Sequence, residues 1–423
     1  MAYDAIIIGG GPAGSSAAVT LAGRGARVLV LEEKRMPREK LCGEFITPEC
    51  FPTLERLGVM DRMLAAGAQR IAHVSLIVAS GKSIKGRVSK MSRDSSWAMS
   101  LSRARFDKIL FDRAREAGAE CLEGFAVRDC VVNHPTSQVE AMSLPSGSRV
   151  SFQAPLIIDA SGRNSRLMVG KRERIAGRRG SRLYALKAHL EGVEGIDDRV
   201  ELYFFKQGYG GLARVEDGLA NLCFIIDERS LRKAGADPSM VIKQTLMNNP
   251  VARKRLRNAR VRGKWHSAGP LTFGRRRLSR EGVIAIGDAS GMIDPFTGTG
   301  IQMALRTGEL AAEAILETRE RKDLACQSSI EGHDRQARRR RSEVSSEGSG
   351  REEGFVPSVL AGYAQRYELE FGRRMRVAEL LRTAAFSPPV ASVVASVLTR
   401  APGLTSFVLR ATRSGQATIQ ALE

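Results

Sequence analysis

The glycine-rich segment at residues 6–18, IIIGGGPAGSSAA, constrains the fold of this 423-residue chain more than any other feature. It fits the pattern G-x-G-x-x-G, in which the first glycine allows a tight turn, the second admits a pyrophosphate to the backbone and the third lets a helix pack on a strand. The N-terminus of that helix favours a bound anion. We therefore predict a dinucleotide site formed by these residues of the segment: Gly9, Gly11, Pro12, Ala13 and Gly14.

The residues on both sides of the glycines support this prediction. Residues 3–8 and 26–33 are typical of buried strands and residues 14–25 of a helix, so together they form a βαβ unit. Glu32 lies at the end of the second strand, where an acidic side chain accepts hydrogen bonds from an adenosine ribose, and Glu33 is the alternative. The predicted ligand therefore carries a free 2′-hydroxyl rather than a 2′-phosphate.

The middle of the chain predicts a second, antiparallel sheet. Two strand-like runs flank Ser80 and Gly81, which indicates a hairpin, and residues 182–226 contain further strand-like runs with a turn at Asp217 and Gly218. Farther on, residues 333–354 contain almost no large apolar side chains, which predicts disorder, and residues 359–413 have the pattern of an amphipathic helix.

The charge of the chain is strongly basic, with 66 lysine and arginine residues against 46 acidic ones and a formal net charge of +20. Basic residues cluster at 171–182, 253–264 and 338–341. No helix-turn-helix, zinc-finger or RNA-binding signature accompanies them, so we expect no nucleic-acid partner. An anionic substrate, an acidic carrier protein or an anionic membrane surface would suit this charge, and a solvated basic surface is the simpler alternative.

Cysteine usage and hydropathy indicate the compartment. The six cysteines form no C-x-x-C pair, so we expect free thiols in a reducing environment. No secretory signal precedes the first predicted strand, and the most apolar run, residues 384–399, contains Pro388 and Pro389 and is too short to span a membrane. We therefore expect a cytoplasmic protein, with peripheral contact to a membrane as an open alternative.

A second motif identifies the dinucleotide. Residues 283–301, VIAIGDASGMIDPFTGTGI, resemble the second FAD motif of the p-hydroxybenzoate hydroxylase-like superfamily of flavoprotein monooxygenases and geranylgeranyl reductases. The resemblance implies non-covalent FAD, with Asp288 bound to the flavin ribitol. It also implies that a glycine loop and a helix N-terminus face the flavin pyrimidine edge, where negative charge develops on reduction. The residues of that loop are Pro295, Gly298, Thr299, Gly300 and Ile301.

Three other segments resemble motifs of the same superfamily. LIIDASGRNS at residues 156–165 resembles its aspartate–glycine motif, although Ser161 interrupts it, and LSRARFDKIL at 101–110 resembles its arginine-containing helix start. PREKLCGEFITPE at 37–49 resembles the loop that crosses the isoalloxazine in the geranylgeranyl reductase branch. The resemblance implies that Arg103 reaches toward the FAD pyrophosphate. It implies further cofactor contacts from Lys40, Cys42, Gly43, Val127 and Asp159.

Few side chains stand out as chemical candidates beside the cofactor. Cys42 and Tyr209 are the candidate catalytic residues, although a buried spectator thiol is an equal interpretation of Cys42. Tyr209 belongs to LYFFKQGYGG at residues 202–211, whose aromatic side chains either line a pocket facing the flavin or pack in the core. The other aromatic residues of this run are Tyr203, Phe204 and Phe205. His189 and His266 are acid–base candidates by residue type alone, and we expect no metal site.

Two missing motifs limit which reactions and which mode of reduction we expect. The W-x-W-x-I-P motif of flavin-dependent halogenases is absent, and Trp97 and Trp265 stand alone, which disfavours halogenation. No second G-x-G-x-x-G domain is present, so NAD(P)H would bind only transiently as the reductant. The expected substrate is a hydrophobic or anionic small molecule, free or bound to a carrier.

The expected fold is α/β, and α+β overall, with an antiparallel sheet inserted into a Rossmann-like domain. The FAD-binding domain is predicted to comprise residues 1–66, 101–165 and 265–325, and the substrate-binding sheet residues 67–100 and 166–264. We expect a disordered basic insertion at 326–354 and a helical C-terminal region at 355–423.

Three functions remain open from the sequence. In the first, NAD(P)H reduces FAD, and the N5 hydride passes to an activated or isoprenoid C=C bond, as the resemblance to geranylgeranyl reductases implies. In the second, a flavin C4a-hydroperoxide hydroxylates an aromatic or polyketide substrate. In the third, the chain is a flavin-bearing protein that docks to a membrane or a carrier protein through residues 362–415.

Overall fold

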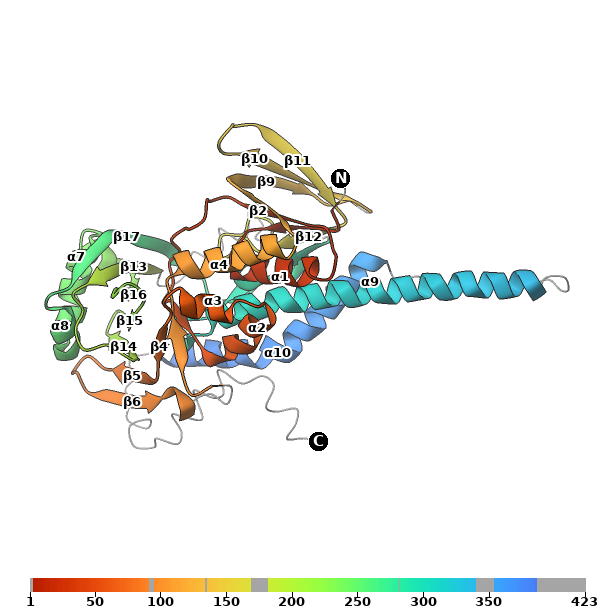
Figure 1. Cartoon of the computed structure of the whole chain (residues 1–423). Helices are drawn as coiled ribbons and strands as arrows, with labels where there is room; N and C mark the ends of the chain where they lie inside the picture. Colours follow the sequence, from red (N-terminus) through yellow and green to blue (C-terminus); the bar gives the residue numbers. More distant parts are fainter. Residues whose placement is uncertain are drawn as a thin grey trace.

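The structure is a computed structural model of the chain, and it describes residues 3–90, 95–133, 135–168, 182–280, 282–339 and 354–385. A largely parallel sheet forms the centre of its cofactor half (Figure 1). Its inner strands are buried on both faces, which explains their continuous apolar runs. In spatial order the strands are β19 (Ser279–Arg280), β20 (Val283–Ala285), β12 (Leu156–Asp159), β1 (Ala5–Ile8), β2 (Val28–Glu32) and β8 (Glu120–Glu123), and only β19 is antiparallel.

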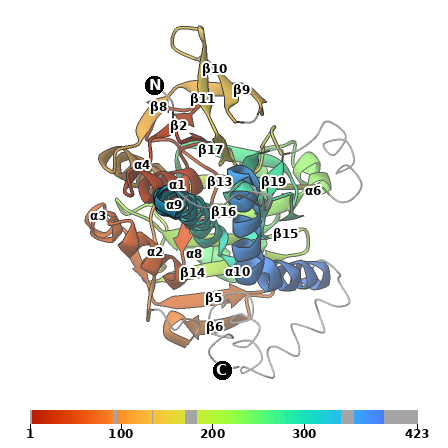
Figure 2. The ribbon, with the colours of Figure 1, turned by 90° about the vertical axis from the view of Figure 1, so that its right-hand side faces the viewer.

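Helices pack on one face of this sheet and a smaller sheet packs on the other. Ile7 and Val30 pack into the helical layer, whereas their neighbours Ile6 and Leu29 pack on the opposite side. The helices are α1 (Pro12–Ala22), α4 (Arg103–Glu116), α9 (Gly300–Arg339) and α10 (Phe355–Ala385), and Figure 2 shows α9 end-on beside α1 and α10. The smaller sheet consists of β9 (Phe125–Val131), β10 (Ser137–Ser143) and β11 (Arg149–Ala154).

A seven-stranded sheet forms the other half of the molecule. Ala188 and Phe224 point to one face, which packs under α6 (Glu228–Lys233), α7 (Pro238–Gln244) and α8 (Pro250–Leu256). Lys187 and His189 alternate with them and point to the opposite face, which looks toward the cofactor half. In spatial order the strands are β17 (Arg260–Leu271), β13 (Leu183–Glu191), β16 (Ala220–Asp227), β15 (Gly208–Arg214), β14 (Arg199–Phe205), β5 (His73–Ile77) and β6 (Ser83–Arg87).

Short elements complete the two halves and the connections between them. The helices among them are η1 (Pro48–Cys50), α2 (Phe51–Arg56), α3 (Met60–Ala65), η2 (Val88–Lys90), η3 (Leu246–Asn248), η4 (Gly287–Ala289) and η5 (Pro295–Thr297). The strands are β3 (Phe45–Ile46), β7 (Ala98–Ser100) and β4 (Gln69–Ile71) in one small sheet, and β18 (Gly274–Arg275) with β21 (Gly291–Met292) in another.

The α/β fold class, the hairpin of β5 and β6, and the antiparallel strands between residues 182 and 227 confirm the sequence predictions. The turn between β15 and β16 holds Asp217 and Gly218 at φ 57° and 71°, as a two-residue hairpin turn requires. The predicted boundary between residues 264 and 265 is wrong. Strand β17 continues through Leu271 because it pairs with β13 along its length.

The segment predicted to be disordered is helical in its first part, so that prediction is wrong for residues 326–339. These residues extend α9, which projects away from the two sheets (Figure 1). Once a helix has formed its first turns, each further residue adds one hydrogen bond at little cost, and no proline interrupts this one. Residues 340–353 lie outside the described residues, as do residues 171–181 of the first basic cluster.

The described part of the C-terminal region is helical, as expected, but its apolar face is already buried. Tyr363, Tyr367 and Phe371 of α10 are each at most 1% exposed and belong to the main hydrophobic cluster. The apolar face of this part is therefore not available to a docking partner, whereas docking through its basic side chains stays a prediction, and residues 386–423 lie outside the described residues. In the described part of the chain, no helix is long and apolar enough to cross a membrane.

Candidate functional site

The glycine turn between β1 and α1 has the close contacts that its sequence requires. Gly9 has φ +107°, and a Cβ atom there would lie 2.5 Å from the carbonyl oxygen of Ala160. A Cβ atom on Gly14 would lie 1.9 Å from the carbonyl oxygen of Gly9. Gly11 differs, because its Cβ would meet only the far end of the Arg38 side chain, at 3.4 Å. Packing therefore explains Gly9 and Gly14, whereas Gly11 leaves the backbone open to a ligand.

The N-terminus of α1 is suited to an anion. Gly11 is its N-cap and offers no side-chain acceptor, Pro12 lies at the first position, and no acidic residue lies in the first turn. The positive end of the helix dipole is therefore not neutralised by the helix's own side chains. This is the position expected for the pyrophosphate of FAD.

Three cationic side chains gather near this helix terminus. Arg38 lies 3.0 Å from Asp107 and 3.3 Å from Glu32, and its buried Nε atom donates no hydrogen bond. Arg103 donates to Asp107 over 2.6 and 2.8 Å. Burial lowers the pKa of Lys40, and repulsion from Arg38 and Arg103 lowers it further. A pyrophosphate would relieve this repulsion, so the residues present fit the group.

Glu32 lies beside the glycine turn, as predicted. Its carboxylate is 6% exposed and accepts hydrogen bonds from the backbone N–H groups of Gly10 over 2.8 Å and Lys34 over 3.0 Å. These bonds fix the carboxylate at the carboxyl end of β2, where a ribose would bind. The contact to the ribose itself stays a prediction.

Asp159 holds a loop beside the site, and Val127 packs below the parallel sheet. The Asp159 carboxylate accepts hydrogen bonds from the Ser161 N–H over 3.0 Å, from the Ser161 hydroxyl over 2.5 Å and from the Ser165 hydroxyl. Asp159 therefore holds the loop that brings Gly162 close to the Lys40 side chain. Val127 is in β9 and packs on the cluster below the parallel sheet. Their cofactor contacts stay predictions.

The second motif lies against the first. Gly287 has φ +58°, and a Cβ atom there would lie 2.9 Å from the Cβ of Ala13. Asp288 follows at the carboxyl end of β20, where its charge acts on Lys40, Arg163 and Arg276. Two motifs that are distant in sequence therefore meet at one edge of the parallel sheet, which is where such sheets bind ligands.

The loop after Asp288 leads into α9 in the way the second motif predicts. Pro295 begins the short helix η5, and Gly298 ends it in the left-handed conformation at φ +69°. Thr299 is 1% exposed and shares a 2.9 Å hydrogen bond with the Thr297 hydroxyl. Gly300 begins α9, and the next residue, Ile301, is buried.

Replacing Asp288 with alanine should weaken FAD retention by about tenfold or more, the effect of losing hydrogen bonds to a charged group. The fold should persist, because the hydrogen bond that Asp288 accepts within the described residues is to its main-chain carbonyl, which alanine keeps. The measurement is the ratio of flavin to protein after gel filtration, with Asp197→Ala as the control because the Asp197 side chain is 82% exposed. Full flavin occupancy in Asp288→Ala would show that the assignment of this motif is wrong.

The loop that carries Cys42 is attached to the seven-stranded sheet. The Cys42 carbonyl accepts a 3.0 Å hydrogen bond from the Asn221 side chain, and its Sγ atom accepts one of 3.3 Å from the Glu44 N–H. The thiol also contacts the Arg103 guanidinium. Gly43 is exposed, with no atom within 4 Å of where its Cβ would lie. Cys42 thus lies between the cofactor half and the sheet, and its catalytic role stays a prediction.

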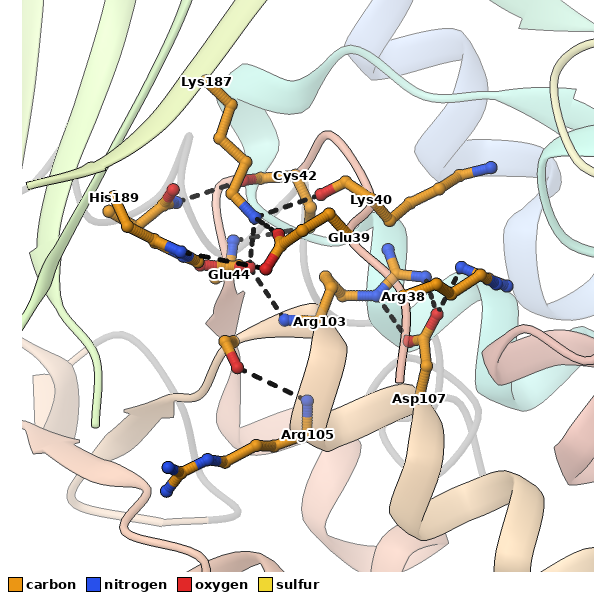
Figure 3. Close-up of polar contacts among 12 residues, drawn as sticks. Arg38, Glu39, Lys40, Cys42, Glu44, Arg103, Arg105, Asp107, Lys187 and His189 are labelled. Carbon is orange, nitrogen blue, oxygen red and sulfur yellow. Dashed lines mark hydrogen bonds and ion pairs between the residues drawn. The ribbon is translucent and has the colours of Figure 1, made fainter. Parts of the chain in front are cut away.

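The sequence did not reveal a buried cluster of charged residues between the two halves (Figure 3). Lys187 Nζ lies 2.5 Å from Glu44 Oε1, 2.9 Å from Glu39 Oε2 and 3.2 Å from the Lys40 carbonyl. His189 Nε2 lies 2.7 Å from Glu44 Oε2. Because Lys187 Nζ already binds both carboxylates, Glu39, Glu44 and His189 form an ion-pair cluster rather than an open metal site, although their ligand atoms lie within 4.8 Å of one another.

The charges of this cluster stabilise each other. Burial lowers the pKa of Lys187, but Glu44 and Glu39 outweigh burial, so the net shift is upward. Burial raises the pKa of Glu39, but Lys187 outweighs it, so the net shift is downward. The sequence signal for this cluster was a lysine in the otherwise apolar run LYALKAHLE, two residues before His189 on the same face of β13.

An aromatic cluster borders the same interface. The ring of Tyr209 lies 6.1 Å from Phe204 and 6.4 Å from Phe296, and Leu41 packs against this group. The Tyr209 hydroxyl donates to Asp294 and accepts a 3.1 Å hydrogen bond from the Phe296 N–H. Burial and Asp294 raise the pKa of Tyr209 well above its usual value, so this hydroxyl holds the loop in place and is not poised to release a proton.

The remaining aromatic residues of LYFFKQGYGG lie elsewhere. Tyr203 and Phe205 pack in the cluster below the opposite face of the sheet, and Tyr203 donates a hydrogen bond to Glu201. Alternation along β14 separates them from Phe204. The pocket interpretation therefore fits Phe204 and Tyr209, and the core interpretation fits the other two.

Comparisons with known proteins identify the family of the chain. The family model described as FAD binding domain matches residues 2–318. The chain is 28% identical over 323 residues to the 1H-pyrrole-2-carbonyl-(peptidyl-carrier protein) brominase of Pseudoalteromonas luteoviolacea, which covers 74% of this chain and 77% of that protein. It is also 28% identical over 336 residues to digeranylgeranylglycerophospholipid reductase 1 of Methanococcoides burtonii, with coverage of 74% and 76%.

The fold is similar to that of a solved flavoprotein. The structure of flavin-dependent brominase Bmp2 matches with a TM-score of 0.73 and 22% identity, covering 97% of this chain and 93% of that one. This likeness concerns the fold.

Proposed function

We propose a reaction for this chain, which belongs to the FAD binding domain family and is an FAD-dependent enzyme. The enzyme reduces a carbon–carbon double bond of a hydrophobic substrate. The observation that carries this proposal is the aromatic cluster of Phe204, Tyr209 and Phe296 with Leu41. It presents apolar surface between the seven-stranded sheet and the start of α9, where an apolar chain would be desolvated.

The residues of the cofactor half would hold FAD in the arrangement described above. Arg38, Lys40, Arg103 and the N-terminus of α1 would bind the pyrophosphate, and Asp288 the ribitol. Bound FAD would supply the hydride, with NAD(P)H as a transient reductant.

Reduction of a double bond also consumes one proton, which the charged cluster would deliver. His189 Nε2 is hydrogen-bonded to the buried Glu44, and His189 Nδ1 lies 4.0 Å from Glu39, whose side chain is 35% exposed. The imidazole therefore lies between a carboxylate with access to solvent and one without it. This arrangement supports proton transfer through His189 to the interior.

A second candidate is halogenation of a carrier-bound substrate, which the missing tryptophan motif disfavours. The similarity to a brominase of carrier-bound pyrrole across 74% of the chain favours it, and a net charge of +20 would suit an acidic carrier. Against it, both tryptophans have packing roles. Trp97 lies 4.8 Å from Phe51, and Trp265 packs 6.0 Å from Phe224 on the far side of the sheet.

Product mass separates these reactions. The FAD-loaded protein would be incubated with NADPH or NADH and a panel of polyprenyl, prenylquinone and carrier-bound pyrrole substrates, without oxygen and then with oxygen and bromide. Addition of two hydrogens without oxygen is the expected result. Oxygen insertion would support the monooxygenase alternative, and replacement of hydrogen by bromine would support the halogenase. Either of these, without any hydrogenated product, would overturn the proposed reductase.

A further inference from the structure

A continuous chain of ion pairs and hydrogen bonds runs from the seven-stranded sheet to the glycine turn, and Figure 3 shows its part from Lys187 to Arg38. It begins at Lys187 on β13 and passes to Glu44 over 2.5 Å. Glu44 Oε1 also accepts a 2.8 Å hydrogen bond from the backbone N–H of Arg103, the first residue of α4. The Arg103 guanidinium binds Asp107, and Asp107 binds Arg38 over 3.0 Å.

The last contact of this chain joins Arg38 to Glu32 beside the glycine turn. Arg38 Nε lies 3.3 Å from Glu32 Oε1, and the other oxygen of Glu32 holds the N–H of Gly10 in the glycine turn. Each residue in this chain is held by the one before it. The two arginines placed for the pyrophosphate are therefore positioned from both ends.

Glu44 occupies a costly position at the centre of this chain. Its side chain is 0% exposed, and its backbone has φ +56°, a left-handed conformation that is unfavourable for a residue with a Cβ atom. A buried carboxylate is tolerated only when it is fully paired, and Lys187 supplies the compensating charge. Lys187 is itself 0% exposed and also binds Glu39 and the Lys40 carbonyl, on the loop that carries Arg38.

We propose that Lys187 is a positioning residue for FAD, acting from the substrate sheet through Glu44 on Arg103 and Arg38. Without the Lys187 ammonium group, the Glu44 carboxylate is buried and lacks its countercharge. The 38–44 loop and the start of α4 then lose the contacts that hold them in place. Because coupling between two sites is reciprocal, a ligand that displaces β13 changes the affinity for FAD, and FAD changes the affinity for that ligand by the same factor. The proposal depends on FAD binding and not on which reaction the enzyme catalyses.

The test measures FAD affinity of the apoprotein by flavin fluorescence quenching, with thermal unfolding of each apoprotein measured in parallel. Lys187→Met should weaken FAD binding by about tenfold or more, within the range found for residues of one charged network. Lys206→Met is the matched control, because Lys206 is an exposed lysine in the turn between β14 and β15 of the same sheet. Unchanged FAD affinity in folded Lys187→Met, with only a lower unfolding temperature, would overturn the proposal.

A double variant tests the same proposal if Lys187→Met does not fold. The double variant Lys187→Met/Glu44→Gln removes both charges, and its amide oxygen can still accept the Arg103 N–H, so FAD affinity should return to within about threefold of the wild type. A double variant no better than Lys187→Met would contradict a role through Glu44. If Lys187→Met is unfolded, the double variant is compared with the wild type instead. FAD binding at least tenfold weaker than in the wild type would then contradict a role through Glu44.

A double-mutant cycle tests whether the two ends act as one network. Asp107→Asn weakens the contact between Arg103 and Arg38 at the cofactor end. If the chain is continuous, the combined loss of FAD affinity in Lys187→Met/Asp107→Asn is smaller than the product of the two single losses. Losses that multiply would show two independent sites and would refute the coupling.

Discussion

Replacing Gly14 with alanine is expected to abolish measurable FAD binding and to destabilise the apoprotein. The new Cβ atom would lie 1.9 Å from the Gly9 carbonyl oxygen and 3.1 Å from the Cβ of Ala160. Both neighbours belong to tightly packed loops at the end of the parallel sheet, so α1 would have to move away from β1. That movement displaces the helix N-terminus that receives the pyrophosphate, and overpacking of this kind costs about 1–3 kcal/mol or more.

Two further glycine variants separate packing from ligand contact. Gly11→Ala should keep the stability of the apoprotein and still weaken FAD binding, because its Cβ meets only the end of Arg38, at 3.4 Å. Gly362→Ala in α10 is the control, since the nearest atom to its Cβ lies at an ordinary 3.8 Å. It should keep full FAD binding and gain up to about 1 kcal/mol of helix stability.

The measurements are flavin content after gel filtration and thermal unfolding of each apoprotein. If Gly14→Ala retained wild-type flavin content, the turn would not be in close contact with the helix. If Gly11→Ala lost stability rather than affinity, Gly11 would be a packing residue, and the ligand-facing interpretation of this turn would be wrong.

The parts of the site that were predictable from sequence are those fixed by local backbone geometry. Gly9 and Gly298 have positive φ angles, and a Cβ atom on Gly14 would meet the Gly9 carbonyl five residues earlier, so the spacing of glycines in the sequence indicated these positions. Asp288 lies where a buried strand ends, and the carboxyl ends of parallel strands share one edge of a sheet. The resemblance to FAD motifs had assigned both ends of the chain to one cofactor, and the structure has them at one edge of the parallel sheet.

The charged cluster could not be predicted in the same way, because it depends on strand register and on contacts between distant segments. Lys187 and His189 lie on one face of β13, but nothing local shows that Glu44 faces them from the cofactor half. For that reason His189 was an acid–base candidate by residue type alone. A charged residue inside an apolar strand indicates that a partner exists, but not which residue it is.

The C-terminal third shows what local patterns leave open. An amphipathic pattern predicts a helix without saying what its apolar face covers, and in α10 that face packs on α9 and the parallel sheet. Low apolar content predicted disorder at residues 326–339, yet they continue a helix whose first turns are held by packing, and each further residue adds a hydrogen bond at little cost.

Truncating Tyr363 to alanine is expected to lower the free energy of unfolding by about 3–5 kcal/mol, as for other large aromatic core side chains. Tyr363 is 0% exposed, and its hydroxyl donates a 2.8 Å hydrogen bond to the carbonyl of Ala285, at the end of β20. Tyr363→Phe should lose only about 1 kcal/mol, because it removes the hydrogen bond and keeps the ring.

Leu369→Ala on the same helix is the matched control. Leu369 is 68% exposed, so its truncation should change the free energy of unfolding by less than about 0.5 kcal/mol. Chemical denaturation of the three apoproteins measures all of these values. A docking helix gives the opposite order, with Leu369 mattering for partner binding and Tyr363→Ala leaving stability unchanged. Because β20 leads directly to Asp288, Tyr363→Ala should also weaken FAD retention, which links the C-terminal helix to the cofactor site.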